Sequence, residues 1–97
     1  MKPAKDVQIL LPPAVSVIVP VLNEGGTINR TIRHLSDACR GAAAEFIIVD
    51  GDPAGSTIHC LGNRQAKTLV APAGRASQMN AGAEAAKGGI LFFVHAD

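Results

Sequence analysis

The stretch VSVIVPVLNE, residues 15–24, decides the fold of this 97-residue chain. It opens with an apolar run, Val15–Val19, which Pro20 closes. Three further runs of the same kind lie at residues 45–49, 67–70 and 90–94. β-branched and aromatic residues are frequent in these runs and turn residues bound them, which is typical of strands. Runs that are apolar almost throughout predict parallel strands covered on both faces.

The segments between these strands show helical spacing. The first begins after Thr27, a candidate N-cap, and is expected to end near Gly41. A second follows Gly74 and is expected to end near Gly88, and a shorter one is expected over residues 54–61. Alternating strands and helices predict an α/β protein: a parallel, Rossmann-like sheet in a three-layer α/β/α arrangement with right-handed crossovers.

Composition narrows the class of protein. Apolar residues make up 47% of the chain, charged residues 18%, and the net charge is +1, which indicates one globular domain. We expect this domain to span residues 14–97 after an N-terminal extension of residues 1–13. Basic residues do not cluster, so we expect no nucleic-acid partner.

The apolar segments are too short and too interrupted by proline for the roughly 20 residues that a membrane span needs. Cys39 and Cys60 have no metal-like spacing, which predicts buried free thiols in a reducing compartment. The expected location is the cytoplasm, including the inner face of the membrane.

Polar residues follow three of the four strands. They lie in the segments 20–24, 50–52 and 95–97. Ligands of parallel α/β sheets bind beyond the carboxyl ends of the strands, so these segments predict a binding site at one rim.

Each polar group at this rim has two interpretations. Asn23 and Glu24 either form a turn before the next helix or bind a sugar hydroxyl or a base edge. Asp50 either caps the next helix or holds a ligand. The segment GDPAGST, residues 51–57, is either a turn or a phosphate site built from backbone amides. Arg75 begins a helix, where the dipole disfavours a cation, and this is explained by a nearby phosphate or by solvent exposure.

Four blocks in this order resemble family 2 glycosyltransferases. The blocks are VSVIVPVLNE (15–24), IVDG (48–51), GRASQMNAG (74–82) and FFVHAD (92–97). The form GRASQMNAG with HAD is similar to a bacterial subgroup of that family. The resemblance covers residues 14–97 and implies the GT-A fold, a nucleotide-diphospho-sugar donor and a divalent cation, Mn²⁺ or Mg²⁺, on the donor diphosphate.

The resemblance also implies residue roles. The residues expected to contact the donor are Pro20, Val21, Asn23, Glu24, Asp50, Gly51 and Arg75. Glu24 would lie near the ribose, Asp50 would meet the base or ribose, and Asn80 with Gly82 would hold the third helix against the sheet. Asp97 matches the closing acid of the family's D-x-D metal motif, and His95 stands where the first acid is usual. His95 is thus a further candidate ligand.

The implied reaction is sugar transfer to an acceptor that the sequence does not identify. The cation would neutralise charge on the nucleoside-diphosphate leaving group. The catalytic base of the family belongs to a later segment, so we expect this chain to be the donor-binding part of a longer enzyme and inactive by itself.

Two alternatives remain at this point. One is a small α/β module that binds a nucleotide or phosphate and transfers nothing. The other is a structural half-domain that self-associates through an exposed sheet edge, because Phe92, Phe93 and Val94 lack partners. A homodimer through that edge is the expected partner interaction.

Overall fold

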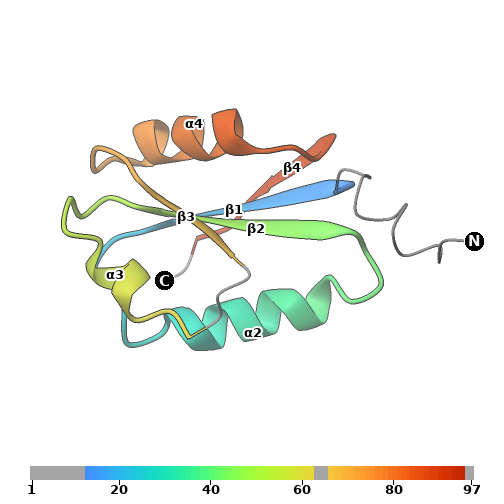
Figure 1. Cartoon of the computed structure of the whole chain (residues 1–97), viewed down its shortest axis with the longest axis horizontal. Coiled ribbons are helices and arrows are strands. Elements are labelled where there is room, and N and C mark those ends of the chain that lie inside the picture. Colours follow the sequence, from blue (N-terminus) through green and yellow to red (C-terminus); the bar gives the residue numbers. More distant parts are fainter. Residues whose placement is uncertain (1–12, 63–65, 96–97) are drawn as a thin grey trace, which may run out of the picture.

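The computed structural model describes residues 13–62 and 66–95. A four-stranded parallel sheet runs through the middle of the molecule in the order β3-β2-β1-β4 (Figure 1). The strands are β1 (Val15–Val21), β2 (Ala44–Asp50), β3 (Lys67–Val70) and β4 (Ile90–Phe93). The helices are α2 (Ile28–Ala38), α3 (Ser56–His59) and α4 (Arg75–Ala85). The predicted α/β fold class is confirmed.

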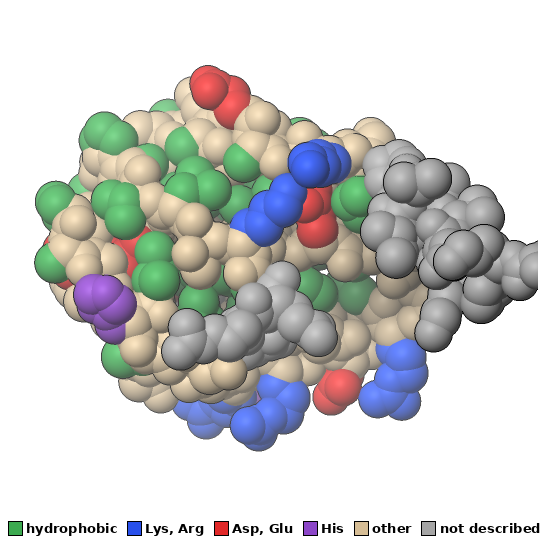
Figure 2. Space-filling view, viewed as in Figure 1, with side chains coloured by type: hydrophobic (Ala, Val, Ile, Leu, Met, Phe, Trp, Pro, Cys, Tyr) green, Lys and Arg blue, Asp and Glu red, His purple; other side chains and the backbone are tan. Residues whose placement is uncertain are grey.

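Helices cover both faces of the sheet, so the molecule has three layers. α2 and α3 lie on one face and α4 lies on the other (Figure 1). Basic side chains and an acidic one lie at the lower edge of Figure 2, on the side of α2, and this helix contributes the exposed Arg30 and Arg33. Among the described residues, no helix has the length and apolar character needed to cross a membrane.

Several element boundaries differ from the predicted ones. β4 ends at Phe93 and not at Val94, α3 is confined to Ser56–His59, and α4 ends at Ala85, before Gly88. Thr27 precedes α2 as expected, but its side chain makes no capping hydrogen bond to the helix. Its hydroxyl instead reaches back to the carbonyl of Glu24.

Pro20 does not close β1, which continues to Val21. The last residue of β1 paired with β4 is Ile18, whose carbonyl accepts a hydrogen bond from the backbone N–H of Val94 at 2.9 Å. Peptide groups of alternate residues face the same neighbouring strand, so the nitrogen of Pro20 faces the β4 side beyond the last pair. A proline is tolerated there because no ladder hydrogen bond is lost.

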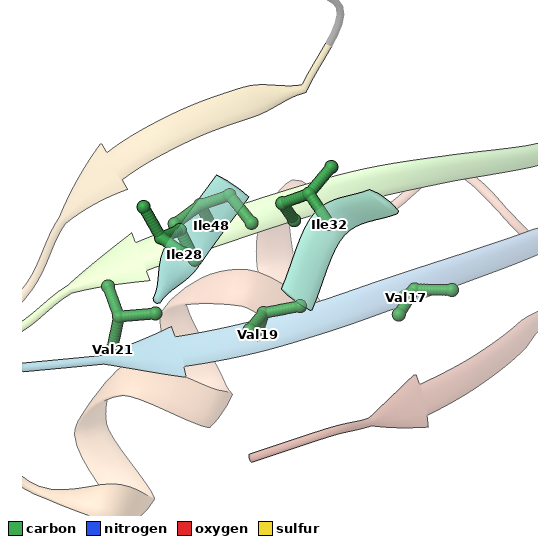
Figure 3. Close-up of a cluster of buried hydrophobic side chains, with 6 residues drawn as sticks. All are labelled: Val17, Val19, Val21, Ile28, Ile32 and Ile48. Atoms are coloured by element: carbon green, nitrogen blue, oxygen red, sulfur yellow. The ribbon is translucent and has the colours of Figure 1, made fainter. Parts of the chain in front are cut away.

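The larger core lies between the sheet and α2 (Figure 3). Its buried members alternate along β1 and recur one helical turn apart on α2, so each element presents one apolar face to the other. They are Val17, Val19, Val21, Ile28, Ile32 and Ile48.

The second core lies between the sheet and α4, and its centre is Gly82. Ile18, Ile47 and Val49 supply the sheet side, and α4 supplies small alanines. A Cβ on Gly82 would lie 2.4 Å from Cγ2 of Ile18 and 3.1 Å from Cγ2 of Val49. The glycine therefore permits the close approach of helix and sheet, as predicted. Asn80 does not share this role, because its side chain is exposed.

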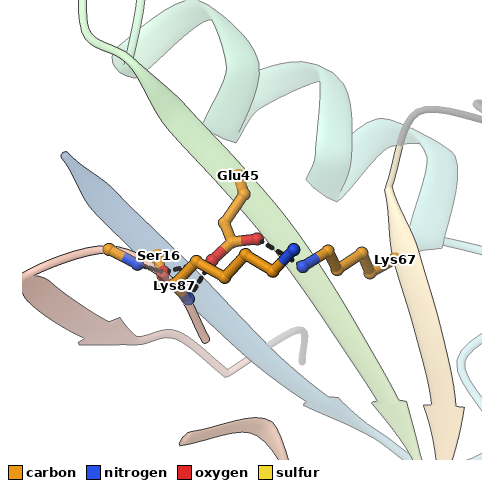
Figure 4. Close-up of polar contacts among 5 residues, drawn as sticks. Ser16, Glu45, Lys67 and Lys87 are labelled. Carbon is orange, nitrogen blue, oxygen red and sulfur yellow. Dashed lines mark hydrogen bonds and ion pairs between the residues drawn. The ribbon is translucent and has the colours of Figure 1, made fainter. Parts of the chain in front are cut away.

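Glu45 organises the opposite end of the sheet from the carboxyl ends of the strands (Figure 4). Its carboxylate accepts hydrogen bonds from the Ser16 hydroxyl at 2.5 Å and from the backbone N–H of Lys87 at 2.6 Å. The ammonium of Lys67 lies 2.9 Å from its other oxygen. The backbone N–H of Gly88 donates to the Ser16 hydroxyl. One carboxylate thus ties β1, β2, β3 and the α4–β4 loop together.

β4 is one of the two edge strands of the sheet, and β3 is the other. All four of its residues are exposed, and the exposed fraction is 55% for Phe92 and 41% for Phe93. Val94, by contrast, is half-buried against the α2 core. The exposure of the two phenylalanines is confirmed, and that of Val94 is partial.

Two sequence predictions concern other parts of the chain. Both cysteines are free, but only Cys39 is partly buried, while Cys60 is exposed. The domain boundary at residues 13 and 14 stays a prediction, since residues 1–12 lie outside the described ranges.

Candidate functional site

A cavity of about 150 Å³ opens at the carboxyl ends of β1 and β4. Its lining comes from the segment that ends β1, the first turn of α4 and the residues after β4. The lining residues are Pro20, Val21, Leu22, Glu24, Arg75, Gln78 and His95. These segments are far apart in sequence and meet because parallel strands direct all their carboxyl ends to one rim, at the left of Figure 1.

Five of the sequence-predicted site residues line this cavity: Pro20, Val21, Glu24, Arg75 and His95. Leu22 joins them as an exposed apolar wall. Arg75 and His95 are exposed and Glu24 is half-buried. An acid, a guanidinium and an imidazole therefore share one small hollow with an apolar wall, a combination suited to a polar ligand with an anionic group.

Asn23 does not line the cavity. It has a φ of 56°, in the left-handed region, and is the one non-glycine residue with positive φ among the described residues. Asparagine tolerates this conformation better than most residues. It makes the turn between β1 and α2, and its contact with a donor stays a prediction.

Asp50 is fully buried, and its carboxylate faces the backbone of the following loop. One oxygen accepts a hydrogen bond from the N–H of Asp52 at 2.9 Å. The other accepts from Thr57 at 2.9 Å and from Ile58 at 3.2 Å. Of the two interpretations of Asp50, the helix-capping one describes this structure, and its contact with a donor stays a prediction.

The loop of residues 51–57 forms a turn around carboxylates. Asp52 accepts hydrogen bonds from the N–H groups of Ala54 and Ser56. Hydrogen bonds from Ser56 and Ala54 hold the pKa of Asp52 below its usual range. The backbone N–H groups of this loop donate to the carboxylates of Asp50 and Asp52, which supports the turn interpretation. The loop therefore offers few free amides to a phosphate.

Thr57 connects this loop to the cavity. Its buried hydroxyl accepts a hydrogen bond from the backbone N–H of Glu24 at 3.0 Å. Asp50 holds Thr57, and Thr57 holds the backbone of Glu24. Asp50 therefore helps to position Glu24, which lines the cavity, although Asp50 is not itself a lining residue.

Gln78 is a cavity residue that the sequence patterns did not single out. Its side chain is 4% exposed, and its amide nitrogen donates to the carbonyls of Val21 and Val49, both at 2.9 Å. Its amide oxygen accepts from the N–H of Gly74 at 3.1 Å. Its spacing from Gly82 could have identified it. A residue four positions before Gly82 lies on the same side of α4, the side that faces the sheet.

Gly51 packs beneath Gln78 and does not line the cavity. A Cβ at this position would lie 2.9 Å from Oε1 of Gln78 and 3.1 Å from Cα of Ala73. Its N–H donates to the carbonyl of Val21 at 2.9 Å. Gly51 thus packs against Gln78 and holds the end of β1, and its direct contact with a donor stays a prediction.

The predicted metal ligands are only partly described. His95 borders the cavity, and Asp97 lies outside the described residues. Across residues 13–62 and 66–95, no three His, Cys, Asp or Glu side chains are grouped so that they could hold a metal ion. One exposed imidazole does not by itself form a site for Mn²⁺ or Mg²⁺, which prefer several oxygen ligands. The described residues therefore do not fit a complete metal centre.

Comparison with known proteins supports the resemblance seen in the sequence. The family model for glycosyl transferase family 2 matches residues 16–97. An uncharacterized protein of Mycobacterium tuberculosis (strain CDC 1551 / Oshkosh) is 32% identical over 95 residues, an alignment that covers 88% of this chain and 28% of that protein. The chain thus spans little more than a quarter of the length of this relative. The match includes every residue of the cavity, and the chain belongs to glycosyl transferase family 2.

Proposed function

We propose that this chain supplies the donor pocket of a glycosyltransferase that moves a sugar from a nucleoside diphosphate to an acceptor. One observation carries the proposal: Glu24, Arg75 and His95, from three separate segments, line one cavity at the carboxyl rim of the sheet. Family membership favours sugar transfer over other uses of such a rim.

The proposed roles follow from the chemistry of the lining. The guanidinium of Arg75 can make two parallel hydrogen bonds to a phosphate, which a lysine cannot match in geometry. The carboxylate of Glu24 can accept hydrogen bonds from two ribose hydroxyls. Pro20, Val21 and Leu22 give the nucleoside an apolar wall that excludes water from one side.

A divalent cation remains part of the proposal through Asp97 and His95. When bound, it would neutralise negative charge on the leaving diphosphate. Of these two candidate ligands, His95 lies among the described residues and borders the cavity.

The alternative of a phosphate-binding module without transfer has less support. Such a module needs backbone amides that are free to bind phosphate. After β2, five backbone N–H groups instead donate to the carboxylates of Asp50 and Asp52.

Titration calorimetry tests the donor pocket directly. Uridine and guanosine diphosphate, each with and without MnCl₂, would be titrated into the wild type, Arg75→Ala and Arg33→Ala. Arg33 is an exposed arginine on α2 and serves as a charge-matched control. We expect Arg75→Ala to weaken binding about tenfold, equivalent to about 1.4 kcal/mol, and Arg33→Ala to bind like the wild type. Absence of binding to either diphosphate, or equal losses in both variants, would contradict the proposal.

A further inference from the structure

Gln78 joins three separate segments at the cavity. Its two donated hydrogen bonds end on β1 and β2, at the carbonyls of Val21 and Val49, and its accepted one comes from Gly74 at the start of α4. Its amide can donate two protons, and each has a partner. A buried amide with this many partners fixes the relative position of the groups it bonds.

The two carbonyls explain why a glutamine is needed. The carbonyl of Val21 already accepts from Gly51 at 2.9 Å, so this oxygen has two donors when Gln78 is present. A methionine would fill a similar volume but donate nothing, and a glutamate would bring a negative oxygen against two carbonyl oxygens. Loss of the amide would thus release α4 from the sheet at the cavity and leave the rest of the helix packed.

The bonded groups are the neighbours of the lining residues. Val21 lies in the β1 wall between Pro20 and Leu22, and Gly74 directly precedes Arg75. Through Val21 and Gly74, the amide ties the backbone of the apolar wall to the backbone that directly precedes Arg75.

We propose that Gln78 is a positioning residue for the donor: it fixes the wall formed by β1 relative to Arg75, so that a nucleoside diphosphate meets both at once. This inference rests on the proposed function for its ligand and on the hydrogen bonds of Gln78 for its mechanism. The side chain is not required to touch the reacting atoms.

The test compares Gln78→Met with Ile32→Val. Ile32 is buried between α2 and the opposite face of the sheet, so its truncation lowers stability without altering the α4 junction. Both variants would be titrated with uridine diphosphate and MgCl₂ at a temperature where urea unfolding shows each to be fully folded. We expect the dissociation constant to be about tenfold larger for Gln78→Met and to change less than twofold for Ile32→Val. A merely structural role would lower stability in both variants and affinity in neither.

Nuclear magnetic resonance supplies a readout that does not depend on the ligand. In the wild type, the side-chain amide protons of Gln78 should exchange with solvent far more slowly than those of the exposed Asn80. In Gln78→Met, the Gly74 amide should lose protection while that of Ile48 keeps it.

The outcomes separate the two hypotheses. If the wild type binds no nucleoside diphosphate, the proposed function fails, and the exchange data alone decide whether Gln78 positions Gly74 and β1. If the wild type binds and Gln78→Met binds equally well, the positioning role is wrong and the donor pocket stands. Rapid exchange of the Gln78 amide protons would also overturn the inference.

Discussion

The carboxylate of Asp50 accepts a hydrogen bond of 2.9 Å from the backbone N–H of Thr57, seven residues along the chain. Both residues are fully buried. The Thr57 hydroxyl then accepts from the N–H of Glu24, so a single acid at the end of β2 shapes both α3 and the wall of the cavity. An acid that sequence patterns place at a binding rim can thus shape the binding site through the loops that it holds.

Replacement of Asp50 by alanine should therefore destabilise the protein. The change leaves three N–H groups without their acceptor, and we expect the free energy of unfolding to fall by about 3 kcal/mol. The chain has no Trp or Tyr, so urea unfolding is best followed by far-UV circular dichroism. Asp37→Ala is the control, because the Asp37 carboxylate pairs with Arg40 at the surface, and the loss of this exposed pair should cost less than about 0.5 kcal/mol. Equal losses in the two variants would refute the capping role.

Gly82→Ala should also destabilise, against the ordinary helix preference. Alanine gains about 1 kcal/mol over glycine within a helix. The added methyl group would, however, meet Ile18 and Val49, and overpacking of this kind costs about 1 to 3 kcal/mol. We expect a net loss in thermal unfolding experiments. Gly89→Ala, where no atom lies within 4 Å of the new Cβ, should stay within about 0.5 kcal/mol of the wild type. A stabilised Gly82→Ala variant would show that α4 does not lie so close to the sheet.

Glu45 should make stability depend on pH in acid. Burial raises its pKa, but the hydrogen bonds from Ser16, from the backbone of Lys87 and from Lys67 more than offset this and lower it from 4.5 to about 2. Because the folded pKa is the lower one, the contribution is fully present above pH 4.5 and is lost as the pH falls through about 2.

Glu45→Gln tests this dependence. At pH 7 the variant should be less stable than the wild type by about 1 to 3 kcal/mol, the range that allows for the solvent exposure of Lys67. The difference should shrink as urea unfolding is repeated towards pH 2. Glu84→Gln, a change on the exposed part of α4, should show no comparable trend. A difference that stays constant with pH would disprove the assignment.

Self-association through β4 is the fourth prediction. Within residues 13–62 and 66–95, the strand exposes apolar side chains on both of its faces and no strand pairs with its outer edge, which favours pairing with a second copy. Phe92→Lys should lower the association constant at least about tenfold in sedimentation velocity, because a charge would be buried at the contact. Asn80→Lys adds the same charge on α4 and should change little. A wild type that remains monomeric over the whole concentration range would rule out this interface.

Much of the architecture could be predicted because it is encoded locally. The apolar runs at 15–19 and 45–49 contain the β-branched residues that strands favour, and the spacing of Ile28 and Ile32 matches one turn of a helix. The boundaries were less predictable. Pro20 is typical of the end of a strand, but β1 continues through it because pairing with β4 has already ended at Ile18, two residues earlier. No local pattern in the sequence shows where a neighbouring strand ends.

The sequence by itself determined the order of strands and helices and therefore the rim at which the polar segments would meet, because period and turn chemistry depend on residues close together in the chain. Only the tertiary structure decided which of those polar groups face the cavity. Asp50 turned inwards to three backbone N–H groups, Asn23 became a turn residue, and Gln78 emerged as the junction of β1, β2 and α4. The physical reason is that a buried polar group must find partners, and those partners come from segments that only the folded chain brings together.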